Sequence, residues 1–140
     1  MKAIRRGTEL AVRLNNVLEA LDPVLTILAS RGIKVFARSM LTDRRGCSLL
    51  LLTDDHQRAR SVLETAGYIC ERNDVLWARY DNYHPGVVAL LCQDLSQMKI
   101  NLQRVYVSTL AGQGCVVVLL TSDNTAALQT ITHNKLQHAA

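Results

Sequence analysis

Aromatic residues are scarce in this sequence, at 4% of 140 positions. A sheet that binds single-stranded RNA needs aromatic side chains on its central strands to stack the bases. The segments that read as central strands, residues 48–52 and 116–120, consist of Leu, Val and one Ser. The formal net charge is +4, but the Lys and Arg residues are scattered along the chain. We therefore expect no nucleic-acid partner.

Long apolar runs are also missing. A membrane-spanning helix needs about 18 or more consecutive apolar residues, and the longest apolar run here, residues 115–120, has only the length of a strand. The basic residues 1–6 are not followed by the apolar stretch and cleavage site of an export signal. We expect a cytoplasmic protein with no membrane contact.

The sequence has no Cys-x-x-Cys pair. Its cysteines lie in apolar segments without a histidine at ligand spacing, so we expect reduced core side chains and no metal or cofactor. Catalysis needs a nucleophile, base and acid that work together, and no histidine here has a repeated carboxylate or cysteine partner. Asp54, Asp55 and His56 read as a helix cap and first turn. An enzyme is not expected.

What the sequence does contain is an internal duplication. Residues 46–55, GCSLLLLTDD, recur as residues 114–123, GCVVVLLTSD, at an offset of 68 and with six of ten positions identical. Upstream the correspondence continues at an offset of 67, which pairs Ile33 with Ile100. A repeat of this kind indicates two copies of one supersecondary unit.

Each copy shows the order of a βαββαβ unit. In the first copy, alternating and helical apolar patterns predict strands over 9–14, 33–41, 47–53 and 68–73 and helices over 17–31 and from the Asp54–Asp55 cap to 66. Pro23 is unusual inside a helix, and the regular helix can instead begin there. In the second copy we predict strands over 75–80, 101–109 and 115–121 and helices over 85–98 and 124–134.

Residues after 134 are too few for a clear last strand of the second copy. The predicted fold class is therefore α+β: two tandem ferredoxin-like units, 1–73 and 74–140, each an antiparallel sheet with helices on one face. The strands over 49–52 and 116–120 are apolar on both faces. This pattern predicts that the second sheet face is buried by the other copy or another subunit. Trp77 and Phe36 are candidates for that face, and we favour a homo-oligomer.

Three segments of the second copy carry a family resemblance: residues 75–80, then Pro85–Gly86, then residues 99–102, KINL. The first copy matches in residues 32–35 and 59–67. In this order, over residues 8–135, the chain resembles the ACT domain, and specifically short bacterial proteins made of two such units.

The resemblance implies a regulatory module that binds an amino acid or a similar small molecule. In that family the ligand lies where the first strand–helix loop of one unit faces the second strand of a neighbour, and a homodimer is expected. A helix N-terminus can bind an α-carboxylate, and asparagine amides can bond the rest of the ligand. The implied ligand-binding residues are Asp81, Asn82, Tyr83, His84, Pro85, Gly86, Val87, Ile100 and Asn101.

The first copy departs from this pattern, since it has no Pro–Gly and carries Lys34 where the second copy has Asn101. It implies a less complete second site formed by Asn15, Asn16, Val17, Gly32 and Ile33. Simpler roles stay open, because Pro85–Gly86 is also a good helix start and Asn101 a good turn amide. The alternative function is a regulatory subunit that acts by contact with a partner enzyme or regulator and has no ligand of its own.

Overall fold

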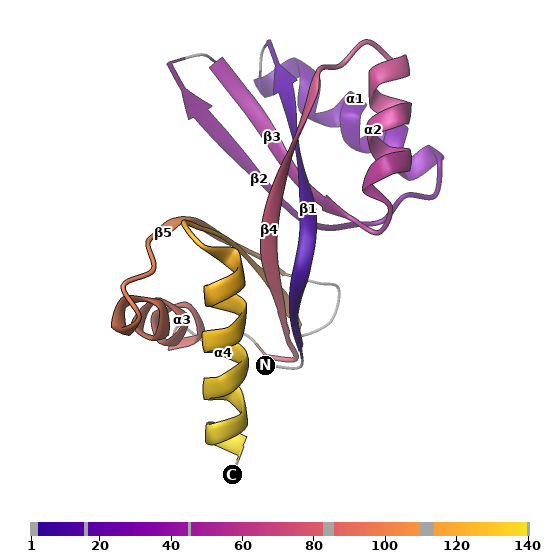
Figure 1. Cartoon of the computed structure of the whole chain (residues 1–140). Coiled ribbons are helices and arrows are strands. Elements are labelled where there is room, and N and C mark those ends of the chain that lie inside the picture. The colour runs from indigo at the N-terminus through magenta and orange to yellow at the C-terminus, as the bar shows by residue number, and fades with distance from the viewer. Residues whose placement is uncertain (1–2, 16, 45, 83–85, 110–113, 140) are drawn as a thin grey trace. The chain divides into compact units, whose positions relative to one another are not determined.

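The fold contains two repeats of a strand–helix–strand–strand–helix pattern (Figure 1). A computed structural model describes residues 3–15, 17–44, 46–82, 86–109 and 114–139, with the backbone alone for 17–21 and 136–139. The elements in chain order are β1 (Ala3–Leu14), α1 (Val17–Ser30), β2 (Val35–Asp43), β3 (Gly46–Thr53), α2 (His56–Thr65), β4 (Cys70–Tyr80), α3 (Gly86–Gln97), β5 (Leu102–Thr109), β6 (Cys115–Thr121) and α4 (Asn124–Ala139). No helix among these residues is long and apolar enough to cross a membrane.

The chain forms two compact units. The first unit is Thr8–Asn73, and the second combines the segment up to Gly7 with Asp74–Ala140. The strand order is β2-β3-β1-β4 in the first unit and β1-β4-β6-β5 in the second. The division falls between Asn73 and Asp74, and the segment up to Gly7 groups with the second unit.

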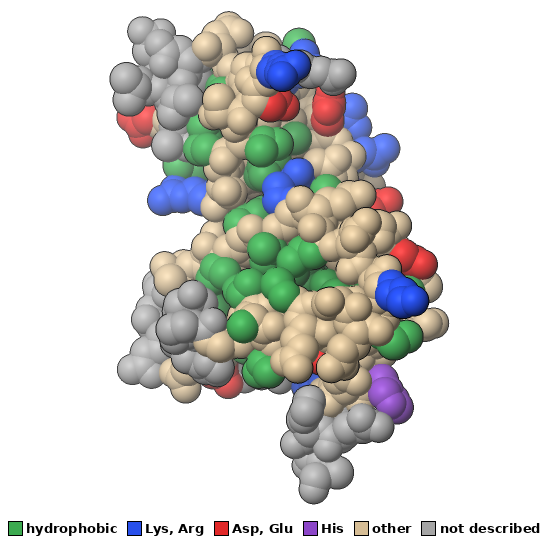
Figure 2. Space-filling model, turned by 90° about the vertical axis from the view of Figure 1, so that its left-hand side faces the viewer, with side chains coloured by type: hydrophobic (Ala, Val, Ile, Leu, Met, Phe, Trp, Pro, Cys, Tyr) green, Lys and Arg blue, Asp and Glu red, His purple; other side chains and the backbone are tan. Residues whose placement is uncertain are grey.

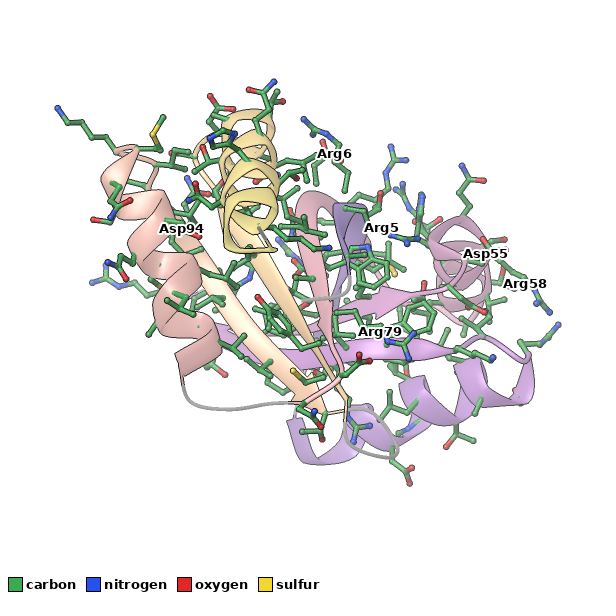
Figure 3. The ribbon with its side chains drawn as sticks, turned by 90° about the horizontal axis from the view of Figure 1, so that it is seen from below. Arg5, Arg6, Asp55, Arg58, Arg79 and Asp94 are labelled. Atoms are coloured by element: carbon green, nitrogen blue, oxygen red, sulfur yellow. The ribbon has the colours of Figure 1, made fainter. Side chains whose placement is uncertain are left out.

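The second unit obtains a fourth strand from the start of the chain. After β6 the chain is helical up to Ala139, so no strand follows in the described part, as expected. The N-terminal part of β1 lies beside β4 instead. Ile4 packs against the core of this unit, and the Arg5 guanidinium lies 5.3 Å from the centre of the Trp77 ring (Figure 3).

Two predicted element boundaries were wrong around this strand. β1 begins at Ala3 and not at residue 9, because Arg5 and Arg6 are accommodated in the strand: Arg5 lies over Trp77, and Arg6 donates a hydrogen bond to the Thr125 hydroxyl. The predicted strands 68–73 and 75–80 are one strand, β4. Asp74, which lies between these two predicted strands, is part of β4, and its carbonyl accepts a hydrogen bond from Asn124 Nδ2 at 2.8 Å.

The helices differ less from the prediction. α1 begins at Val17 and contains Pro23 in its interior, and α4 extends to Ala139 and not to 134. α2 and α3 lie within their predicted ranges, and Asp55 is the residue that caps α2. Pro85, the predicted first residue of α3, lies outside the described residues.

Each unit has a core between its helices and one face of its strands. Leu49 and Leu51 of β3 lie in the core of the first unit, and Val117 and Leu119 of β6 lie in that of the second. The alternate residues on the opposite face are buried as well, since Leu50 and Val118 are each 1% exposed within the single chain. The predicted burial of both faces is confirmed. Phe36 and Trp77 are only half-buried.

The first helix of each unit ends in the same hydrogen-bond pattern. Ile33 N–H donates to the Leu28 carbonyl and Gly32 N–H to that of Ala29, while Ile100 and Lys99 donate in the same way to Leu95 and Ser96. This pair of bonds is a Schellman motif, which needs a left-handed residue after the helix. In the first unit that residue is Gly32, with φ +70°, and in the second it is Lys99, with φ +57°.

We predict that Lys99→Gly stabilises the protein. A non-glycine residue in the left-handed region costs roughly 1–2 kcal/mol, whereas a cation at a helix C-terminus returns only about 0.3–1 kcal/mol. The expected net gain is about 0.5–1 kcal/mol in the free energy of unfolding, measured by urea denaturation.

The reciprocal variant Gly32→Lys is the matched control. A Cβ added at Gly32 would meet no atom within 4 Å, so the main penalty is that of the left-handed backbone conformation, and a loss of stability is expected. If Lys99→Gly is no more stable than the unmodified protein, or if Gly32→Lys is not destabilised, the left-handed conformation is not a source of strain.

Candidate functional site

The predicted ligand loop lies between β4 and α3 in the second unit. Asp81 and Asn82 are exposed directly after β4, and Gly86 is the first residue of α3. Val87 is buried in the core of the second unit, which fixes the start of the helix. Tyr83, His84 and Pro85 lie outside the described residues. The described parts of this loop therefore present two polar side chains and a helix N-terminus.

Tyr80 holds the strand end from which the loop departs. It is paired with Cys115 across β4 and β6 and packs against the core. Burial, together with Cys115 and Asp94, raises the pKa of Tyr80 to about 12. The phenol is therefore neutral at physiological pH and does not bring a charge to the loop.

The other predicted segment lies where α3 leads into β5. Ile100 is buried, whereas Asn101 is exposed. Asn101 N–H donates to Ser122 Oγ at 3.1 Å, and Ser122 N–H donates to the Asn101 carbonyl at 2.9 Å. This pair of bonds uses the Asn101 backbone to join the start of β5 to the end of β6, while the residue itself stays at the surface.

The second unit does not bring these two segments together. Gly86 begins α3, whereas Ile100 and Asn101 follow its C-terminal end. α3 has 12 residues, and a helix of that length measures about 18 Å at 1.5 Å per residue. A ligand of amino-acid size cannot touch both ends, so the predicted residues can share a ligand only if a neighbouring unit supplies one of the two segments.

The less complete predicted site in the first unit has the same separation. Asn15 is exposed before α1, and Val17 is the first residue of that helix, while Asn16 lies outside the described residues. Gly32 and Ile33 lie beyond its far end. Both of these form the Schellman motif, and Ile33 is buried in the core. Each residue therefore has a structural role at the end of α1.

The junction before the second helix of each unit repeats closely. Asp55 Oδ1 accepts from Arg58 N–H at the start of α2, and Asp123 Oδ1 accepts from Ala126 N–H at the start of α4, each at 3.0 Å (Figure 3 labels Asp55 and Arg58). These are helix N-caps. The preceding residues differ in charge: Asp54 accepts from Lys34 N–H at 3.0 Å, where the second unit has the neutral Ser122.

The described residues contain no group of three or more His, Cys, Asp and Glu side chains that could hold a metal ion. Cys70 and Cys115 are buried, and burial raises the pKa of both thiols, so little reactive thiolate forms. Cys47 and Cys92 are half-buried. On the face in Figure 2, Lys and Arg side chains lie dispersed and do not form one continuous stripe.

The strand order and helix placement of each unit define a ferredoxin-like α+β fold. The model of the ACT domain pair family matches residues 7–140, and the chain therefore belongs to that family. The search of curated proteins found no significant match.

Solved structures share this fold. A Bacteroides thetaiotaomicron protein is 20% identical with a TM-score of 0.78, and the match covers 94% of this chain and 90% of that one. The regulatory subunit of aspartate kinase from Thermus thermophilus, in its ligand-free form, is 17% identical with a TM-score of 0.64, and the match covers 94% of each chain. At these identities the likeness establishes the fold.

Sequence reasoning missed one further difference between the units. In the second unit the Thr121 hydroxyl and Asn124 Oδ1 are hydrogen-bonded at 2.7 Å. The corresponding atoms in the first unit are Thr53 Oγ1 and His56 Nδ1, and both are buried without a hydrogen-bond partner among the described residues. The 68-residue offset pairs His56 with Asn124, so the sequence repeat contained this signal.

We predict that His56→Asn stabilises the first unit. The new amide would give the Thr53 hydroxyl the hydrogen-bond partner that Asn124 gives to Thr121 in the second unit. The expected gain is about 1 kcal/mol, the net contribution of a typical hydrogen bond, measured as a rise in the midpoint of urea unfolding. The reverse variant, Asn124→His, should lose more than this, because it also removes the hydrogen bond from Asn124 Nδ2 to the Asp74 carbonyl. A destabilised His56→Asn protein would mean that the two junctions are not equivalent.

Proposed function

We propose that this protein is a regulatory amino-acid sensor with no catalytic centre of its own. Its membership of the ACT domain pair family is the observation that carries the proposal. One structural neighbour is named as a regulatory subunit of aspartate kinase, which supports a regulatory role here. The unpaired state of all four cysteines is in keeping with a cytoplasmic location.

The N-terminus of α3 is the part of the proposed site that receives the ligand's α-carboxylate. The first N–H groups of a helix have no partner within the helix and carry a partial positive charge. α3 has no acidic residue in its first turn to neutralise that charge. Gly86 has no side chain to block a close approach, and in this proposal the exposed Asp81 and Asn82 bond the ligand's α-ammonium group.

A second copy of the chain completes the proposed site. Because the two ends of α3 are about 18 Å apart, the segment at Ile100 and Asn101 belongs to a different site from the Gly86 loop of the same unit. In a two-fold homodimer the loop of one copy faces the β5 segment of the other, which gives two equivalent sites. The exposed Leu90 and Met98 on and after α3 add apolar surface for this contact.

The first test is a thermal-shift panel of the standard amino acids. We expect one or a few to stabilise the protein, by about 2.7 kcal/mol at 100 times the dissociation constant. Gly86→Val should abolish the shift, because its side chain blocks the approach to the α3 N-terminus, and the protein should stay folded by circular dichroism. If no amino acid shifts the melting temperature, a role through protein contact alone replaces this proposal.

The second test asks whether two copies share the site. Asn101→Ala and Gly86→Val should each lose binding alone, but a refolded equimolar mixture should recover about a quarter of the sites, since half the dimers are mixed and each has one intact site. Calorimetry measures the recovered stoichiometry. If the mixture does not bind, or if Asn101→Ala binds normally, the proposed sharing between copies is wrong.

A further inference from the structure

Polar groups gather where α3 leads into β5 in the second unit. Lys99 and Asn101 are exposed, and the Asn101–Ser122 pair of backbone-anchored hydrogen bonds holds Ser122 beside Asn101. The ammonium of Lys99 has no ion pair or hydrogen bond among the described residues. The Ser122 hydroxyl oxygen accepts from Asn101 N–H and keeps its own proton to donate. Ammonium, amide and hydroxyl are all donors.

The fold itself does not require Lys99. Its position is a left-handed helix end that the first unit fills with Gly32, and glycine adopts this conformation without strain. A strained residue that the fold does not need indicates a role for its side chain. What the lysine adds over the glycine is one exposed positive charge next to Asn101.

The equivalent junction of the first unit, between α1 and β2, has different polar groups. There the carboxylate of Asp54 accepts the hydrogen bond from Lys34 N–H, so a negative charge already occupies the position of the Ser122 hydroxyl. In the second unit the adjacent carboxylate, Asp123, is engaged as the α4 cap. At these three equivalent positions the first unit therefore has glycine, the Lys34 ammonium and a carboxylate. The second unit has the Lys99 ammonium, the Asn101 amide and the Ser122 hydroxyl.

We propose that Lys99, Asn101 and Ser122 bind the side-chain carboxylate of an acidic amino acid. This inference rests on the proposed function, in which the α-carboxylate of the same ligand binds the α3 N-terminus of the neighbouring copy. The ligand's α-carboxylate then binds the α3 N-terminus of one copy, and its side-chain carboxylate binds the Lys99 cluster of the other copy. The ligand class is aspartate or glutamate, and their amides are the natural discriminating probes because they have the same shape without the charge.

The test measures the affinities of L-aspartate, L-glutamate, L-asparagine and L-glutamine by calorimetry. We expect an acid to bind at least about tenfold more tightly than its amide, since hydrogen bonds to charged groups are the stronger ones. Lys99→Gly should lose this preference by weakening only the acid, while its melting temperature does not fall. Ser122→Asp, which introduces the first unit's carboxylate, should lose it too.

Two variants control for general charge effects. Lys99→Arg keeps the positive charge and should keep the preference for the acid. Arg58→Gln removes one positive charge from the surface of α2 in the first unit (Figure 3) and should also keep it. An acid preference that survives both Lys99→Gly and Ser122→Asp overturns the assignment of these residues.

The same titrations separate the carboxylate site from amino-acid sensing in general. If amino acids bind but the amides bind as tightly as the acids, or if an apolar or basic amino acid binds best, the carboxylate site is wrong and the sensing function stands. If no amino acid binds at all, both are wrong.

Discussion

The pairing of β1 with β4 is the constraint on which the rest of the structure depends. A βαββαβ unit is closed by a last strand beside its first, and the chain meets this requirement twice by making both strands long. Thr8–Leu14 and Cys70–Asn73 belong to the first unit, while Ala3–Gly7 and Asp74–Tyr80 belong to the second. The first unit is thus one continuous segment of the chain, and the second is assembled from two segments on either side of it.

Duplication kept the backbone of the units alike and let their polar side chains diverge. The Schellman motifs and the aspartate caps use equivalent residues, because these bonds satisfy helix ends that otherwise lose free energy. The differences lie beside them, at Gly32 and Lys99, Asp54 and Ser122, and His56 and Asn124. The proposed preference for an acidic ligand depends on two of these differences, Lys99 in place of Gly32 and Ser122 in place of Asp54, since they give the second unit two donors where the first has a glycine and a carboxylate.

The repeat and the helix-facing cores were predictable from the sequence, because the identical residues of 46–55 and 114–123 include Leu51 and Leu119, which lie in the two cores. The N-terminal part of β1 was not, since an apolar pattern cannot anticipate that Arg5 will lie over Trp77. The continuity of β4 was also missed, because the charged Asp74 interrupts the apolar pattern of the strand. For the site, the sequence pointed to Gly86 and Asn101, and the predicted helix over 85–98 already separated them. It could not show that Lys99 adopts the left-handed conformation, because a lysine gives no signal of it.

The number of amino-acid molecules bound per chain tests the central claim, that one of two similar units senses the ligand. Each chain has one complete set of site residues, namely the Gly86 loop together with the Lys99, Asn101 and Ser122 cluster, and the first unit has neither. Isothermal titration calorimetry with the amino acid that stabilises the protein should therefore give a stoichiometry of one per chain. Two equivalent sites per chain, or none, would contradict the account.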